Sequence, residues 1–321
     1  MAKAYGFAGH VALGKEASGG TPVAVTDYVE AFSESFALNF DRIDLVNIAG
    51  RLSEPDDMVG ISRIEGQVVF PFNPANGGHF LKGAFGVQST SIVSSGFLYT
   101  QEYTPAGIGG EFGTKFELQP YTFEIFRDAG SAQQYTGVQM SSIEFNIVPN
   151  QDVRCTLGLI GTGETDISKT TPTFPGSPND PFAFDTASVS IAGVANADLE
   201  SLTITFDNQL EGIGGLANTT NITKIRRSGF QLVRIAGDIA FENINELIAY
   251  RAQTERRYVV SVTRANSFQM IFDLPRVVLD GFPIGISGRD RVVASFSGRG
   301  RYHTGSGNAI KITLTTTKSD F

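Results

Sequence analysis

The 321-residue chain carries a formal net charge of −8, from 33 Asp and Glu against 25 Lys and Arg. That balance argues against a nucleic-acid-binding surface, because neutralising phosphates requires clustered Lys and Arg. A single cysteine, Cys155, excludes an intrachain disulfide and, with only three histidines, a zinc-type cluster. No cofactor and no bound metal are expected.

The charge is unevenly distributed along the chain. Residues 1–160 hold 9 Lys and Arg against 17 Asp and Glu, which leaves 25 − 9 = 16 and 33 − 17 = 16 in the remainder. All the net negative charge therefore lies in the first half. Two electrostatically different halves would orient subunits that stack head to tail, and an unselected surface bias is the alternative.

Hydrophobic residues make up 41% of the sequence, enough at this length for two domains with a core each. The 36 Gly and 13 Pro separate short runs of Val, Ile, Phe and Thr, which is typical of many short strands. The start at Met1-Ala2-Lys3 has no secretory apolar segment, and no run of roughly 18 apolar residues predicts a membrane span. A mainly β fold is expected.

In chain order, a Gly-rich stretch of mixed polarity predicts an N-terminal arm over residues 1–25. A first domain follows at 26–160, in which Ser35–Asp41 alternates apolar and polar residues as a half-buried strand does. A short helix is expected at about 76–85. Residues 161–190 are dense in Gly, Thr, Pro and Asp and predict a linker or an extended arm that a neighbouring subunit orders.

The second domain, 191–321, repeats these features. Ser201–Asp207 has the same alternation as Ser35–Asp41, and Arg63-Ile64-Glu65-Gly66 recurs as Arg234-Ile235-Ala236-Gly237. A second helix is expected at about 243–254, and the closing strands recur at an offset of 277 − 138 = 139, from Val138 to Val277. We interpret the chain as two tandem copies of one β-sandwich or barrel unit, each with one flanking helix.

Two Gly-rich segments imitate nucleotide-binding motifs. Gly9-His10-Val11-Ala12-Leu13-Gly14-Lys15 has phosphate-loop spacing, but Glu16 replaces the hydroxyl residue that meets Mg²⁺ and would repel phosphate. Gly212-Ile213-Gly214-Gly215-Leu216-Ala217 continues as a polar loop where a dinucleotide fold needs a helix. Loops explain both segments better.

No catalytic arrangement stands out. Cys155 lies in an alternating strand pattern and is interpreted as a buried structural thiol. Glu54, Asp56 and Asp57 form an acidic group in a Pro-containing loop, and a solvated loop is favoured there over a cation site or a glycosidase pair. The protein is not expected to be an enzyme.

Basic side chains occur in doublets and alternations without interleaved aromatics, which favours subunit-interface ion pairs over DNA contact. The candidate interface residues are Arg226, Arg227, Arg256, Arg257, Arg289 and Arg291.

Several segments together resemble the tail tube proteins of long-tailed (siphophage-type) bacteriophages. They are Leu13-Gly14-Lys15-Glu16 followed by Gly20-Thr21-Pro22, Gly83-Ala84-Phe85-Gly86, Tyr135-Thr136-Gly137-Val138 leading into Ile143-Glu144-Phe145-Asn146-Ile147, and Ile204-Thr205-Phe206-Asp207-Asn208. The resemblance spans most of the chain and rests on structural motifs.

The resemblance implies a virion protein whose units contribute strands to a closed inner barrel of hexameric rings, stacked into a channel for DNA. With two units per chain, three chains would form a pseudo-hexameric ring. The implied partners are other copies of the chain, the tape measure, tail terminator and distal tail proteins, and passing DNA without specific binding; no membrane is involved. Candidate lumen-facing residues are polar positions of alternating strands: Asn39, Asp41, Thr203, Thr205 and Asp207.

Three alternatives remain open from the sequence. One is a ring of six chains in which the second half decorates the outside. Another is a β-sandwich adhesin or baseplate component that binds host carbohydrate, although the absence of Trp removes the best residue for stacking on sugars. A carboxylate-dependent hydrolase ranks below both.

Overall fold

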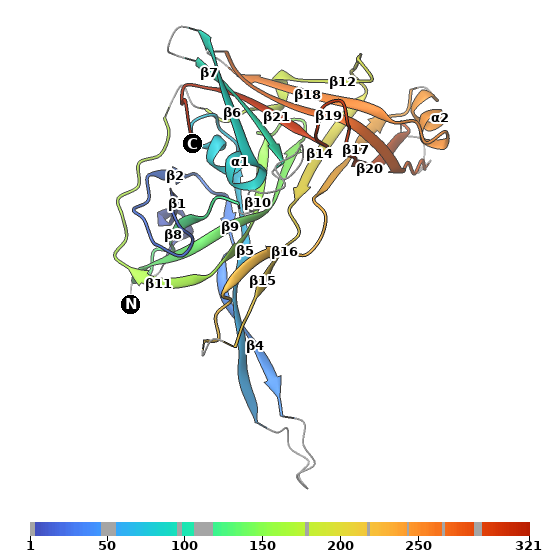
Figure 1. The fold of residues 1–321 in the computed structure, drawn as a ribbon. Helices are drawn as coiled ribbons and strands as arrows, with labels where there is room; N and C mark the ends of the chain where they lie inside the picture. Colours follow the sequence, from blue (N-terminus) through green and yellow to red (C-terminus); the bar gives the residue numbers. More distant parts are fainter. Residues whose placement is uncertain are drawn as a thin grey trace.

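The computed structural model describes residues 4–45, 56–94, 98–105, 118–176, 180–216, 219–242, 244–264, 267–285 and 291–321. Within these ranges the protein is mainly β, as predicted, with strands packed in two layers and two short α-helices (Figure 1). Both helices fall where the sequence places them: α1 at Gly77–Phe85 and α2 at Asn245–Arg251. Asn243 lies outside the described residues.

The first outer sheet belongs to the first half of the chain. Its antiparallel strands are, in spatial order, β2 (Asp27–Val29), β1 (His10–Lys15), β8 (Tyr121–Phe126), the first part of β9 (Ala132–Ile147) and β11 (Gly163–Ile167). β1 thus lies inside the segment expected to be an arm. Its Val11 and Leu13 are buried in the core, so this strand is ordered by its own chain.

The inner sheet runs through both halves without interruption. Its strands are β4 (Ala37–Asp44), β5 (Asp57–Pro71), β10 (Arg154–Gly161), the second part of β9, β14 (Leu199–Asp207), β17 (Leu232–Ala240), β20 (Val293–Gly300) and the end of β19 (Phe268–Gly281). The short β3 (Ser33–Glu34) also pairs with β5. The β9–β14 ladder is the point where the two halves join.

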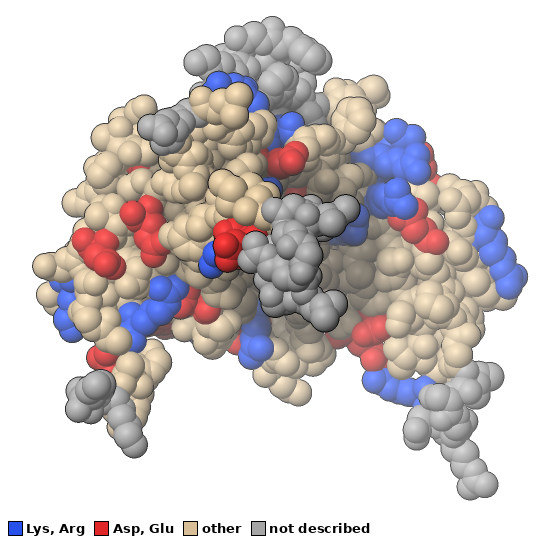
Figure 2. Space-filling view, turned by 90° about the horizontal axis from the view of Figure 1, so that it is seen from below, with Lys and Arg blue, Asp and Glu red and all other residues tan. Residues whose placement is uncertain are grey.

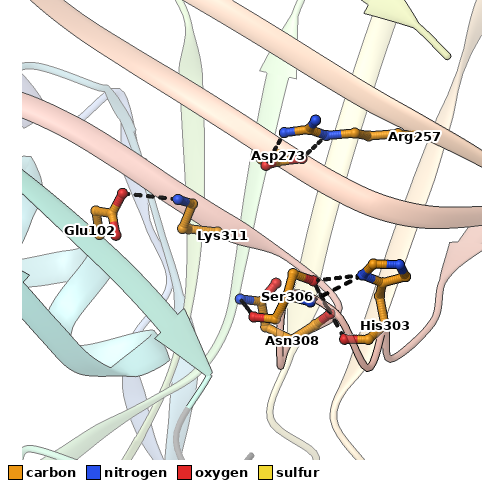
Figure 3. A network of polar contacts seen from close by, with 7 residues as sticks. All are labelled: Glu102, Arg257, Asp273, His303, Ser306, Asn308 and Lys311. Carbon is orange, nitrogen blue, oxygen red and sulfur yellow. Dashed lines mark hydrogen bonds and ion pairs between the residues drawn. The ribbon is translucent and has the colours of Figure 1, made fainter. Parts of the chain in front are cut away.

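The second outer sheet mixes elements from both halves. Its order is β13 (Val194–Asn196), β12 (Ala187–Ile191), β18 (Arg256–Arg264), the first part of β19, β21 (Lys311–Thr316), β7 (Leu98–Pro105) and β6 (Gly86–Ser94). The β6–β7 hairpin follows α1 in the first half and extends the sheet of the second. An ion pair of 2.9 Å between Lys311 of β21 and Glu102 of β7 accompanies this pairing (Figure 3).

The remaining regular elements are short. They are the hairpin β15 (Leu210–Ile213) and β16 (Lys224–Arg227) and the 3-10 turns at Gly6–Ala8 and Phe184–Thr186.

The hydrophobic core lies between the inner and outer layers and is continuous across the halves. Phe145 of β9 contacts Phe272 of β19 with ring centroids 4.9 Å apart, and Phe85 at the end of α1 stacks on Phe206 of β14 at 4.3 Å. All four rings are almost fully buried. Because these contacts join residues of different halves, the halves share much of their packing energy.

The segment expected to be a linker at 161–190 crosses the protein's own surface. β11 pairs with β9, and further on Thr170 donates from its backbone N–H to the buried Glu124 at 2.8 Å. Phe182 is fully buried, and its backbone is hydrogen-bonded to Phe72 and Val153. These contacts fix much of the segment without a neighbouring subunit.

A glycine is required at the same place in each half of the inner sheet. A Cβ atom on Gly66 would lie 2.4 Å from the carbonyl oxygen of Ser35, and one on Gly237 would lie 2.2 Å from that of Ser201. Both distances are far below van der Waals contact, so only glycine lets the neighbouring strand approach this closely.

We expect Gly237→Ala to destabilise the fold by about 1–3 kcal/mol, because the added methyl group must push two hydrogen-bonded strands apart. Urea unfolding of the purified monomer measures this loss. Gly6→Ala, whose new methyl group would meet no atom within 4 Å, is the matched control. Equal stability of both variants would contradict the steric account.

Candidate channel-lining and assembly surfaces

The inner sheet has one buried face and one polar face. Leu38, Ile204 and Ile235 point into the core. Directly paired residues of antiparallel strands share a face, so the register defines the opposite face row by row. One row consists of consecutive partners across the sheet: Val69, Thr156, Glu144, Thr205, Arg234, Arg299 and Val278. We call this surface the polar face.

All five candidate lumen-facing residues lie on the polar face. Asn39 and Asp41 are exposed on β4, and Thr203, Thr205 and Asp207 are half-buried on β14. The hydroxyl of Thr205 donates to Glu144 at 3.1 Å, and Asp207 accepts the backbone N–H of Gln209 at 2.7 Å. The structure thus brings these residues together on one continuous surface.

Acidic groups outnumber basic ones on the polar face. Among the described residues, the register and the ion pairs place on it Asp41, Asp44, Asp57, Glu65, Glu144, Asp207, Asp238 and Asp280 against Arg42, Arg63, Arg154, Arg234 and Arg299. Arg63 is 3.2 Å from Asp41, and Arg299 is 2.6 Å from Asp280. Positive charge on this face is therefore largely matched by neighbouring carboxylates.

Seen from the end at which the β4–β5 hairpin lies, blue and red side chains are interspersed over the surface (Figure 2). This distribution differs from the broad basic stripe of a protein that holds phosphates.

Three of the six candidate interface arginines form ion pairs within the described part of the chain. Arg256 contacts Glu246 and Arg257 contacts Asp273, both at 2.7 Å, and Arg291 contacts Glu200. Figure 3 shows the two-pronged contact of Arg257 with Asp273.

The other doublet lies on β16. Arg226 is exposed, whereas the guanidinium of Arg227 donates to Asn208 at 3.1 Å and burial lowers its pKa. Arg289 lies outside the described residues. A role of these arginines between subunits remains a prediction.

The segment with phosphate-loop spacing, Gly9–Lys15, contains strand β1 and is followed by a hydrogen-bonded turn. Lys15 ends β1, and the carboxylate of Glu16 is 1% exposed. It accepts hydrogen bonds from the Thr122 hydroxyl at 2.8 Å and from the backbone N–H groups of Gly20 and Gly137. Residues 10–15 form β1 and pair with β2 and β8, so this segment is a strand of the sheet and does not form a phosphate-binding loop. In the segment compared with a dinucleotide-binding turn, Gly212 and Ile213 belong to β15, and Ala217 lies outside the described residues.

A long β4–β5 ribbon projects from the body of the protein (Figure 1). Its direct partners Ile43 and Met58 are 52% and 54% exposed, and Val59 is 50% exposed. The sequence pattern found the start of β4 but treated residues 54–57 as a solvated loop. Asp57 instead pairs with Asp44 in the ribbon and lies 3.2 Å from Arg42; Glu54 is outside the described residues. The apolar and polar residues keep alternating past Asp41, and this pattern could have predicted the longer strand.

Cys155 is fully buried in β10, as predicted, and burial raises the pKa of its thiol. A thiol in that environment is a poor nucleophile. Neither of the two described helices is long and apolar enough to cross a membrane.

A charged cluster ties the last described residues to the first half. Asp27 contacts Lys318 at 2.8 Å and His79 at 3.2 Å. Burial raises the pKa of the Asp27 carboxyl, but hydrogen bonds from His79 and Lys318 outweigh burial and hold the pKa well below its ordinary value of 3.8. The ionised carboxylate therefore stabilises the folded protein.

Because the folded-state pKa of Asp27 is depressed, its contribution is present above about pH 4 and is lost as the pH falls below that value. We expect Asp27→Asn to cost about 1–2 kcal/mol at pH 7 and progressively less towards pH 3. Urea titrations of both proteins at pH 7, 5 and 3 measure this difference. A cost that does not change with pH would contradict the assignment.

The two layers, the continuous polar face and the projecting ribbon define a β-sandwich protein that presents large strand surfaces. The family model of the phage tail tube protein matches residues 6–300. The chain belongs to this family, which confirms the resemblance found in the sequence and gives the protein a structural role in the phage tail of the virion. No curated protein matches the chain.

Proposed function

We propose that three copies of the chain close into a ring, and that such rings stack into a tube that conducts DNA during ejection. The observation that carries this proposal is the β9–β14 ladder, which joins four strands of one half to four of the other in one sheet. Three such sheets give 3 × 8 = 24 strands around a closed channel. Closure also removes the open edges of each sheet.

The proposed repeat is supported by matching strand registers in the outer sheets. Tyr121 pairs with Val138 before the ladder shifts to Phe123 and Tyr135. In the second half, Arg256 pairs with Val277 before the same shift, to Tyr258 and Leu274.

The inner sheets match in the same way. Leu38 pairs with Ile64 as Ile204 pairs with Ile235, and each ladder has its close-contact glycine. Domain boundaries at 26–160 and 191–321, with arms at 1–25 and 161–190, belong to the same proposal.

Ring closure follows from the repeat. β9 of the first half binds β14 of the second, and β14 corresponds to β4. By the same rule, the end of β19 lies beside β4 of the next chain. The contact within one chain is then the pattern for the contact between chains, and rotation closes it after three chains.

The polar face becomes the wall of the channel. An acidic face with paired arginines repels the phosphate backbone and gives DNA no site to adhere to, so DNA slides. The proposed partners are copies of the chain, the tape measure, tail terminator and distal tail proteins, and passing DNA. Assembly takes place in the host cytoplasm, the protein has no enzymatic activity, and no membrane takes part.

Electron microscopy of the purified protein tests the ring directly. Rings or tubes with a central channel and a mass of three chains per ring are the expected result. Persistent monomers at high concentration, or six chains per ring, would contradict the proposal.

The β4–β5 ribbon is proposed to contact the adjacent ring, because it extends beyond the sheet and exposes apolar side chains. We expect the double variant Ile43→Asp, Met58→Asp to form single rings that no longer stack, since charge at that contact costs several kcal/mol when desolvated. Val194→Asp, an exposed apolar residue (70%) at the turn between β12 and β13, is the control for a general solubility effect. Sedimentation separates rings from tubes, and normal tubes from the double variant would rule out this role.

Lysines on the polar face should make the channel adhere to DNA. Asn39→Lys together with Thr203→Lys adds six positive charges per three-chain ring, and we expect these tubes to retain short double-stranded DNA in a salt-sensitive manner. Ser188→Lys, at the exposed position of β12 in the outer sheet, is the control, compared with each single variant because it adds three charges per ring. Fluorescence anisotropy of labelled DNA measures retention. Equal retention by both variants would place the polar face outside the channel.

A further inference from the structure

The contact between α1 and β14 shows how a helix of one half covers the inner sheet of the other. The Phe85 ring stacks on Phe206 at 4.3 Å, and the side-chain amide of Asn208 donates to the carbonyl oxygen of Ala84 at 2.7 Å. Phe206 is therefore only 1% exposed.

At the corresponding place in the first half, Phe40 is 52% exposed. Leu38, Phe40 and Ile64 form the apolar floor of a cavity of about 440 Å³, and Glu164, Thr165 and Asp166 of β11 lie on its rim. Asn221 completes the lining. Among the described residues, neither Glu164 nor Asp166 forms an ion pair. We call this the Phe40 cavity.

The helix α2 has a surface that matches the Phe40 cavity. Ile244 and Ile248 are 52% and 54% exposed, although they lie one turn apart on the same side of a helix. Arg251 follows Ile248 by three residues and is exposed on the same side. Leu247 and Tyr250 instead pack against the core, which fixes α2 on its own domain.

The two surfaces lie on opposite lateral sides of the protein. Figure 1 shows β11 at the left and α2 at the right, with the β4–β5 ribbon pointing downward between them. One chain therefore cannot bring its own α2 to its own cavity, whereas a neighbour placed beside it can.

We propose that α2 of each chain docks in the Phe40 cavity of the next chain of the ring, with Ile248 over Phe40 and Arg251 beside Glu164 and Asp166. This inference rests on the proposed ring. It repeats between chains the contact that α1 and Phe206 make within one chain, with a charge pair added at the rim. Burial of the isoleucines and Phe40 supplies the affinity, and the charges fix the orientation.

Disulfide trapping tests the contact. The double variant Phe40→Cys, Ile248→Cys is assembled under reducing conditions and then oxidised; native Cys155 is 0% exposed and does not interfere. We expect covalent dimers and closed trimers on a denaturing gel, and no larger species. The controls are the two single variants and the double variant Phe40→Cys, Val194→Cys. None of these three proteins should form the dimer and trimer bands.

The outcomes separate this inference from the proposed function. Intact tubes from the double variant without cross-links would overturn the α2 contact and leave the ring standing. Ladders longer than three chains would place the contact between rings and also overturn it. If the unmodified protein forms no rings, the proposed function itself fails.

A charge test does not depend on cysteine geometry. Arg251→Glu should raise the critical concentration for assembly roughly tenfold, and the added change Glu164→Arg should restore most of the loss. Arg301→Glu, another exposed arginine, is the control, and thermal unfolding of the monomer verifies that each variant folds. No rescue by the second change would overturn the charge pair.

Discussion

The antiparallel ladder between β9 and β14 is the contact on which the rest of the structure depends. It aligns Ser142–Ile147 with Leu202–Asp207 and makes one sheet from two halves of the chain. Without it, the polar face would end at β9, and the apolar faces behind the two half-sheets would not share a core. The β6–β7 hairpin and α1 reinforce the same junction from the outer side.

This arrangement is consistent with the DNA channel that we propose for an acidic chain. Arginines are present on the polar face, but Arg63 and Arg299 are held by Asp41 and Asp280. Their charge is then used to order neighbouring strands, and phosphates passing along the face meet a near-neutral to acidic surface.

The two junctions of the proposed ring differ in one respect. Within a chain, the β6–β7 hairpin pairs with β21, whereas only Ala252–Glu255 connects α2 to β18 in the second half. β11, which corresponds to β21 under the proposed repeat, pairs with β9 and has no strand on its outer edge among the described residues. In the proposed ring, the junction within a chain therefore has the β7–β21 pairing, for which the second half shows no counterpart among the described residues.

Much of the fold could be predicted from the sequence because alternation in single strands is a local signal. Alternation predicted strands at Ser35–Asp41 and Ser201–Asp207, where the structure has β4 at Ala37–Asp44 and β14 at Leu199–Asp207, and the two helices and the buried Cys155 were found. The five polar candidates could be chosen because alternate residues of one strand share a face.

The rest depended on contacts distant in sequence. The position of β1 in the first outer sheet and the pairing of β7 with β21 have no local signal. The sequence offset of 139, continued past Val277, matches Ile143 to Phe282. Under the proposed repeat, the strand pairing matches Ile143 to Ile284 instead, since Ile143 pairs with Leu157, Ile284 bridges Ala294, and a bulge follows Leu279. The Phe40 cavity was invisible because β4 and β11 meet only in the folded chain.

A cryo-electron microscopy map of the assembled tube tests the central claim most directly. The account predicts threefold rings with a 24-stranded inner wall, in which Ser35–Asp41 and Ser201–Asp207 alternate at the same radius with their polar side chains towards the channel. A map in which Ser201–Asp207 lies outside the wall, in a ring of six chains, would contradict it.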